Sequence, residues 1–375
     1  MSTVYRLRPW RNPEYKGLNV LINAFGSPMR QEVVVAGQEP EPSGPGRIIQ
    51  LPAFSLPFPS EIHPDTDSVI AHTCRWALAT GLVPDEAGVA RLRQGGIMTA
   101  GPRLAPRALL DAACLVSDWT VFLIVLDDEF DEHELGTQPE LARAAIEDVA
   151  AAFAGTARVA GGLPRMAGIA TAAADLGRRF AAQSPGPAWL ARFRANAEAH
   201  IRSKVSEAEH RAAAGFLDVG SYVALRRVTS AAYTYADLAE LAEQATVTRQ
   251  VRESPAWGQA LDAAADVWLG IQDVCSAAKE VGAGDNLNLA AVMARSAGGT
   301  LQQGVDDAYQ WVRRRSADLA AQRAQLTAGA GDPSSSTQCL DALDRLLDAL
   351  DRLLGGHLTW NSKDNPRYPQ AMPIA

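Results

Sequence analysis

Apolar residues recur about every 3.6 positions along most of this chain, which is the spacing of one buried helix face. A helical pattern begins near Asp65 and continues to Thr80, and similar Ala- and Leu-rich stretches follow as far as Leu358. Short Gly- and Pro-rich breaks, such as residues 161–164 and 184–187, separate these stretches. No alternation of strands with helices appears, so the pattern predicts an all-α bundle.

Two polar clusters interrupt the apolar pattern, and the first stands at the end of an apolar run. Residues 121–126 are all apolar and lead directly into Asp127-Asp128-Glu129-Phe130-Asp131. Residues four apart share one face of a helix, so Asp127 and Asp131 project together. A buried charge requires a partner, so these carboxylates are candidate ligands of a cation.

The second cluster runs from Gln272 to Glu280 and reads QDVCSAAKE. Gln272, Ser276 and Glu280 are spaced four apart and therefore share a helix face. Hard oxygen ligands from two helices suit Mg²⁺, which keeps several waters and is usually completed by substrate phosphates. Together the two clusters predict a diphosphate site.

From about Leu51 to its C-terminus, the chain resembles the bacterial class I terpene synthases. Asp127–Asp131 looks like the DDxxD motif of that family, and Gln272–Glu280 is similar to its second metal motif, NDxxSxxKE. Arg226 looks like the pyrophosphate-sensing arginine, and Arg367-Tyr368 looks like the Arg-Tyr pair that binds diphosphate in bacterial members. The resemblance implies a single class I helical bundle with a central active-site cavity.

The resemblance also implies a reaction. A terpene cyclase ionises a linear allylic prenyl diphosphate, most often farnesyl diphosphate in bacteria, with three Mg²⁺ ions in the closed complex. It then cyclises the cation to a hydrocarbon or alcohol and releases diphosphate. The expected metal ligands are Asp127, Asp131, Gln272, Ser276 and Glu280. The residues expected to bind the substrate diphosphate are Arg226, Lys279, Arg367 and Tyr368, and those expected to be catalytic are Asp127, Arg226, Glu280, Arg367 and Tyr368.

Gln272 departs from the family pattern, because the family usually has Asn at this position. Gln offers the same amide oxygen on a side chain one methylene longer, and Mg²⁺ tolerates little distortion of its octahedron. A helix break follows the sensor arginine in the family and moves when diphosphate binds. Thr229 and Ser230 occupy that stretch here, although their neighbours are equally compatible with a continuous helix.

Apolar and aromatic side chains are expected to line the cavity, where aromatic faces can stabilise a passing cation. Trp119, Phe122 and Trp360 are candidates for this wall, and a core-packing role is at least as compatible with each. Leu123 and Ile124 stand where many bacterial members carry aromatics, and Ser230 is a further candidate.

Three other functions remain open from the sequence. A cyclase of C20 geranylgeranyl diphosphate differs only in substrate length. A chain-elongating prenyltransferase shares the helical fold but carries two aspartate-rich motifs, whereas this chain has one. A non-catalytic helical binding protein descended from a cyclase is supported only by Gln272.

Composition narrows these possibilities further. The 375 residues are 47% apolar with a formal net charge of −8, which supports a large core and argues against general nucleic-acid binding. The four cysteines lie far apart without CxxC spacing, so no zinc site or disulfide framework is indicated. The N-terminus lacks the apolar core of a signal peptide, and no apolar stretch is long enough to span a membrane. A cytoplasmic protein is expected, with a homodimer as one possible assembly.

Two further features bear on organisation. The Pro- and Gly-rich residues 38–46 mark off an N-terminal extension, residues 1–50, from an α domain at residues 51–375. The heptad DALDRLL at residues 341–347 recurs at 348–354. Two heptads favour an amphipathic bundle helix over a coiled-coil partner, and Gly355-Gly356 is expected to end that helix.

Overall fold

The structure is a computed structural model that describes residues 49–131, 133–156, 164–213, 215–282, 284–329 and 337–368. Within these ranges the chain forms fourteen α-helices and no strand, which confirms the all-α prediction. The predicted extension lies outside the described residues up to residue 48. In the described ranges, no helix combines the length and the apolar character needed to cross a bilayer. The helices are α1 Thr66–Ala79, α2 Glu86–Gln94, α3 Ala100–Leu104, α4 Leu110–Asp131, α5 Pro139–Ala154, α6 Pro164–Gln183, α7 Pro187–Ala213, α8 Val219–Thr229, α9 Ala232–Glu243, α10 Arg249–Arg252, α11 Pro255–Gly282, α12 Leu289–Ala297, α13 Leu301–Gly329 and α14 Thr337–Thr359, with the 3₁₀ turns η1 Ile97–Thr99 and η2 Glu134–Thr137 and the π-helical segment η3 Trp360–Asp364.

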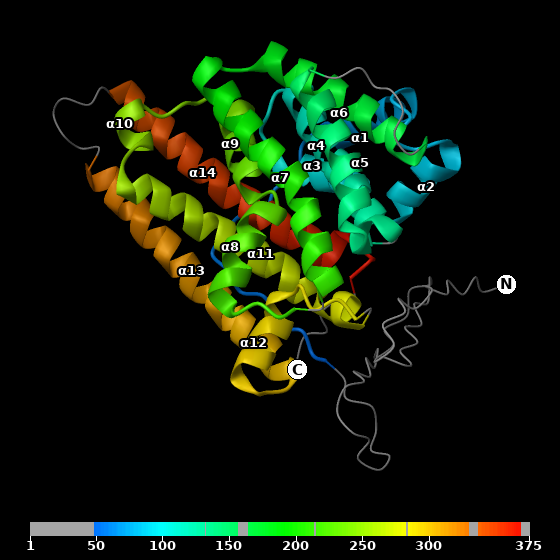
Figure 1. Cartoon of the computed structure of the whole chain (residues 1–375). Coiled ribbons are helices and arrows are strands. Elements are labelled where there is room, and N and C mark those ends of the chain that lie inside the picture. The colour runs from blue at the N-terminus through cyan, green and yellow to red at the C-terminus, as the bar shows by residue number, and fades with distance from the viewer. Residues whose placement is uncertain are drawn as a thin grey trace.

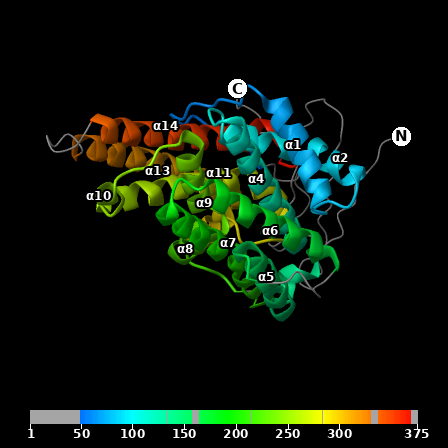
Figure 2. The ribbon, with the colours of Figure 1, turned by 90° about the horizontal axis from the view of Figure 1, so that it is seen from above.

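The two helices that carry the polar clusters, α4 and α11, form the centre of the bundle (Figure 1). Every residue of α4 from Ala112 to Leu123 is buried, and so is every residue of α11 from Ala263 to Ile271. A helix buried on all sides belongs in the core. α4 contacts α1, α3, α6 and α9, while α11 contacts α9, α12, α13 and α14. Seen from above, α13 and α14 lie along one edge of the bundle and α5 lies at the other (Figure 2).

The ends of α1 and α4 agree with the sequence pattern. α1 begins at Thr66 and ends at Ala79, as the pattern from Asp65 to Thr80 predicts. α4 ends at Asp131, so the acidic cluster forms its last turn. The carboxylates therefore follow a buried helix to the point where it leaves the core.

The heptad repeat lies within α14, which packs inside the bundle. Its buried leucines, including Leu343, Leu346 and Leu350, belong to the main core, and the helix contacts α9, α3 and α11. These contacts agree with the bundle-helix interpretation.

The prediction that Gly355-Gly356 ends this helix is wrong, because α14 continues to Thr359. A β-carbon on Gly355 would lie 2.0 Å from the carbonyl oxygen of Pro59, and one on Gly356 would lie 2.2 Å from that of Arg103. The two glycines therefore allow the incoming chain and α3 to pack directly against the helix backbone. Glycine lowers helix propensity by about 1 kcal/mol relative to alanine, and this close packing explains its presence here.

Candidate active site

The acidic turn of α4 lies against a row of charged side chains on α7. Asp127 Oδ1 accepts a hydrogen bond from Lys204 Nζ at 2.5 Å, and Asp131 Oδ1 accepts one from Arg211 Nη2 at 2.8 Å. The other partner of Lys204 is Glu207, whose Oε2 lies 2.8 Å from Nζ. Both aspartates predicted to bind metal are thus ion-paired with cations of the protein itself.

The pKa values of Asp127 and Asp131 are shifted in opposite directions. Burial raises the pKa of Asp127, but the ammonium group of Lys204 outweighs burial and holds that pKa well below its usual range. Burial and the neighbouring carboxylate of Asp127 raise the pKa of Asp131 to about 7. Burial lowers the pKa of Lys204, but the carboxylates of Asp127 and Glu207 raise it above its ordinary value, so the ammonium stays charged.

The second cluster lies on a helix, as predicted, and occupies the last turns of α11. Ser276 is fully buried, while Gln272, Lys279 and Glu280 are half-buried. Glu280 Oε2 accepts a hydrogen bond from Asn288 Nδ2 at 2.9 Å. Burial and the nearby carboxylate of Asp273 raise the pKa of Glu280 to about 7.

Asp273, next to the predicted ligand Gln272, holds the candidate sensor arginine. Its fully buried carboxylate accepts hydrogen bonds from Arg226 Nε at 3.0 Å, from the Leu289 backbone N–H at 2.9 Å and from the Tyr222 hydroxyl. Arg226 Nη1 lies 4.0 Å from Glu207 Oε1. A continuous series of charged contacts therefore links the first cluster to the second through α7 and α8.

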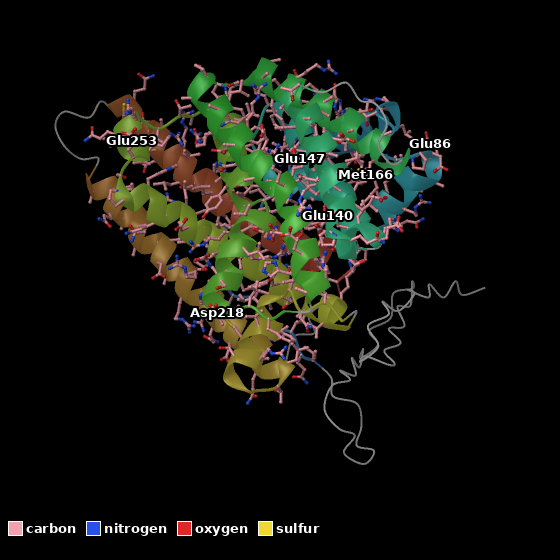
Figure 3. All side chains as sticks on the ribbon, viewed as in Figure 1. Glu86, Glu140, Glu147, Met166, Asp218 and Glu253 are labelled. Atoms are coloured by element: carbon pink, nitrogen blue, oxygen red, sulfur yellow. The ribbon has the colours of Figure 1, made fainter. Side chains whose placement is uncertain are left out.

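A helix break follows Arg226, as the resemblance implies. α8 begins at Val219, after its N-cap Asp218, which Figure 3 labels, and ends at Thr229, and α9 begins at Ala232. Ala231 has φ = 59°, a left-handed conformation that is uncommon for alanine and interrupts the helix. The Ser230 carbonyl at this break accepts a hydrogen bond from Trp268 Nε1 at 3.0 Å.

The C-terminal Arg-Tyr pair also reaches the site. Arg367 Nη2 lies 2.5 Å from Asp128 Oδ1, so Asp128 forms an ion pair. Burial and the carboxylate of Glu280 raise the pKa of Tyr368 above its ordinary value, and Asp127 contributes in the same direction. Tyr368 therefore experiences the charges of both clusters.

Two of the aromatic candidates for the cavity wall, Trp119 and Phe122, lie in an aromatic cluster of the core. Trp119 packs against Phe122, Phe153, Phe180 and Phe193, with ring centroids no more than 5.7 Å away. For Trp119 and Phe122 the structure thus favours the core-packing role.

Trp360 is also mostly buried, and its indole N–H donates to the Gly96 carbonyl at 2.8 Å. Leu123 is buried and Ile124 is half-buried on α4, and Ser230 is buried at the helix break. An aromatic stack that sequence reasoning missed lies beside that break: Trp268 stacks on Tyr235 at 4.5 Å and on His357 at 3.5 Å.

The donor set fits Mg²⁺ chemically, because the predicted ligands offer carboxylate, amide and hydroxyl oxygens. The raised pKa values of Asp131 and Glu280 also agree with a metal site, because a divalent cation would favour the ionised forms of these carboxylates. Within the described ranges, however, no three His, Cys, Asp or Glu side chains converge as a metal-binding group. In this conformation Asp127 and Asp131 face Lys204 and Arg211 instead.

The sequence patterns did not indicate a functional role for Lys204, Glu207, Asp273 or Trp268. Only helical spacing could have found Trp268, which stands one turn before Gln272 on the same face of α11. Lys204 and Glu207 belong to a helix with many charged residues, where nothing in the sequence separates buried from exposed positions.

Comparisons with known proteins identify the family of this chain. A family model for terpene synthase family 2, C-terminal metal binding, matches residues 118–318, more than half of the chain. The (+)-T-muurolol synthase of Roseiflexus castenholzii, named as cyclizing (2E,6E)-farnesyl diphosphate, is 30% identical over 268 residues, which are 71% of this chain and 80% of that protein. Pentalenene synthase of Streptomyces avermitilis is 31% identical over 264 residues, 70% of this chain and 76% of that protein. The crystal structure of germacradien-4-ol synthase from Streptomyces citricolor superposes with a TM-score of 0.71 at 24% identity, covering 82% of this chain and 97% of that one. The chain therefore belongs to the bacterial class I terpene synthase family.

Proposed function

We propose that residues 51–375 form a Mg²⁺-dependent terpene cyclase that ionises farnesyl diphosphate and cyclises the resulting cation to a hydrocarbon or alcohol. The observation that carries this proposal is the series of contacts from Asp127 through Lys204, Glu207 and Arg226 to Asp273. It joins the two predicted metal motifs and the candidate sensor in one charged site. The cytoplasm is our prediction for the compartment.

Leaving-group stabilisation is the chemistry that such a site supplies. Mg²⁺, when bound, would offset the negative charge that develops on the departing diphosphate. Arg226 and Arg367 would donate hydrogen bonds to its oxygens, and a guanidinium does so without losing its proton. The raised pKa of Tyr368 keeps its phenol protonated and able to donate as well. The buried residues of α4 and α11 would keep water from the cation, which water would otherwise quench.

Farnesyl diphosphate is preferred over longer substrates because a relative that is 30% identical is named for cyclizing it. The C20 cyclase remains the alternative, since the aliphatic Leu123 and Ile124 precede the aspartate motif where many members carry aromatics.

The test is incubation of the purified protein with C10, C15 and C20 allylic diphosphates, with and without Mg²⁺, followed by mass spectrometry of the organic extract. We expect a cyclic product from the C15 substrate only when Mg²⁺ is present. A product from the C20 substrate alone would assign the longer chain. No product from any substrate, from a folded sample, would contradict the proposal.

A further inference from the structure

The face of α7 that meets the acidic turn of α4 carries charges that the recognised motifs do not explain. Lys204, Glu207 and Arg211 are spaced three and four residues apart, so they form one charged stripe along the helix. Lys204 is its most buried charged member, with a side chain only 1% exposed. A long cationic side chain is rarely buried to this degree unless it is paired.

Both partners of Lys204 are carboxylates, and one of them is a predicted metal ligand. Its ammonium lies 2.5 Å from Asp127 Oδ1 and 2.8 Å from Glu207 Oε2. An ammonium at hydrogen-bond distance from a carboxylate oxygen occupies one of its lone-pair directions. A divalent ion that coordinates Asp127 Oδ1 along this direction would displace Lys204.

Glu207 can remain the ion-pair partner of the Lys204 ammonium after that ammonium leaves Asp127. It is three residues away on the same helix, its side chain is 8% exposed, and it already contacts Nζ. Without it, Lys204 would be a buried charge with no counter-ion once Asp127 was taken by metal, which is strongly unfavourable. The pair is therefore arranged so that Lys204 can leave Asp127 without leaving all of its partners.

We infer that Lys204 is an internal counter-ion of Asp127 that competes with the incoming divalent ion, and that Glu207 retains the ammonium after displacement. This inference rests on the proposed function, because it assumes that Asp127 binds metal. Lys204 and Glu207 are then positioning residues that set the metal concentration at which the site fills.

The inference predicts opposite effects for the two residues. Lys204→Met removes the competitor and should tighten divalent-ion binding about tenfold, a change at the low end of those seen for groups that contact metal ligands. Glu207→Gln leaves the displaced ammonium without a counter-ion and should weaken binding by a similar factor. A purely structural role would shift both variants in the same direction.

The experiment is a titration of the full-length protein with Mn²⁺, without substrate, in which electron paramagnetic resonance measures the free ion. Arg202→Met is the matched control, because Arg202 lies on α7 but pairs with Glu147 and Glu198 on the outside of the bundle. Figure 3 labels Glu147 on α5. The control should bind Mn²⁺ as the wild type does, and thermal unfolding should show that each variant is folded.

Unchanged or weaker binding by Lys204→Met would overturn the inference while leaving the proposed function intact. If that variant does not fold, Glu207→Gln decides alone: weaker binding supports the inference, and unchanged or tighter binding overturns it. Absence of Mn²⁺ binding in the wild type as well would overturn the inference together with the proposed metal site.

Discussion

Asp273 offers a sharp test of how the site is assembled, because one buried carboxylate holds three elements together. It accepts hydrogen bonds from Tyr222 and Arg226 of α8 and from the first backbone N–H of α12, while belonging to α11. Its side chain is fully buried. Replacement by Asn keeps the shape of the side chain but removes the charge and one acceptor oxygen.

The magnitude follows from what Asp273→Asn leaves behind. Arg226, whose side chain is 11% exposed, loses its nearest carboxylate. The NH₂ group of the new amide faces at least one of the former donors, and two donors cannot form a hydrogen bond with each other. Breaking one side of a buried ion pair typically lowers the free energy of unfolding by about 3–5 kcal/mol. We expect a loss in this range, because Glu207, 4.0 Å from Arg226, is too far away to replace the lost partner fully.

Urea unfolding of the wild type and of Asp273→Asn, followed by circular dichroism, measures this loss. The matched control is Asp318→Asn, which removes an aspartate that is 52% exposed and pairs with Arg315, and which should change stability by less than about 1 kcal/mol. A loss for Asp273→Asn no larger than the control's would refute the conclusion that Asp273 anchors Arg226.

Three other changes test Gln272 as a metal ligand, the close packing at Gly356 and the burial of His357. Gln272→Asn should preserve or raise the rate of product formation if the longer amide is a compromised ligand, whereas a marked loss in steady-state assays would show a site adapted to Gln. Gly356→Ala should lower the free energy of unfolding by about 1–3 kcal/mol, because its β-carbon would lie 2.2 Å from the Arg103 carbonyl, and an unchanged melting temperature would contradict this. Burial lowers the pKa of His357 from 6.5 to about 3, so between these values the unfolded chain binds more protons and stability is lost as pH falls. At pH 4.5, two pH units below 6.5, the free energy of unfolding lost in this way is about 2.7 kcal/mol. The stability gap between the wild type and His357→Gln should therefore narrow from pH 7 to pH 4.5, and a constant gap in urea unfolding would argue against it.

The sequence predicted the helical class and the placement of both motifs because these depend on local periodicity. The run of apolar residues before Asp127 indicated a buried helix, and α4 is one. The helix break after Arg226 could only be expected from the resemblance, since the alanines around it fit a continuous helix equally well. Its left-handed residue, Ala231, carries no sequence signal of the kind that a glycine would give.

The remaining features depend on packing between segments far apart in the chain. Lys204 meets Asp127 across 77 positions, and Gly356 meets Arg103 because α14 lies against α3. Periodicity cannot show which charge on α7 faces inward or why two glycines are placed inside a helix. Tertiary contact decides both, and for Gly355-Gly356 it reversed the prediction of a helix end.

The assignment of the metal site is tested by the release of inorganic diphosphate from farnesyl diphosphate by the wild type, Asp127→Ala and Glu280→Ala. Circular dichroism should first show that all three proteins are equally helical. We expect Mg²⁺-dependent release by the wild type and none by either variant, because each variant loses a predicted metal ligand. Release by both variants at the wild-type rate would contradict the assignment of these two helices as the metal site.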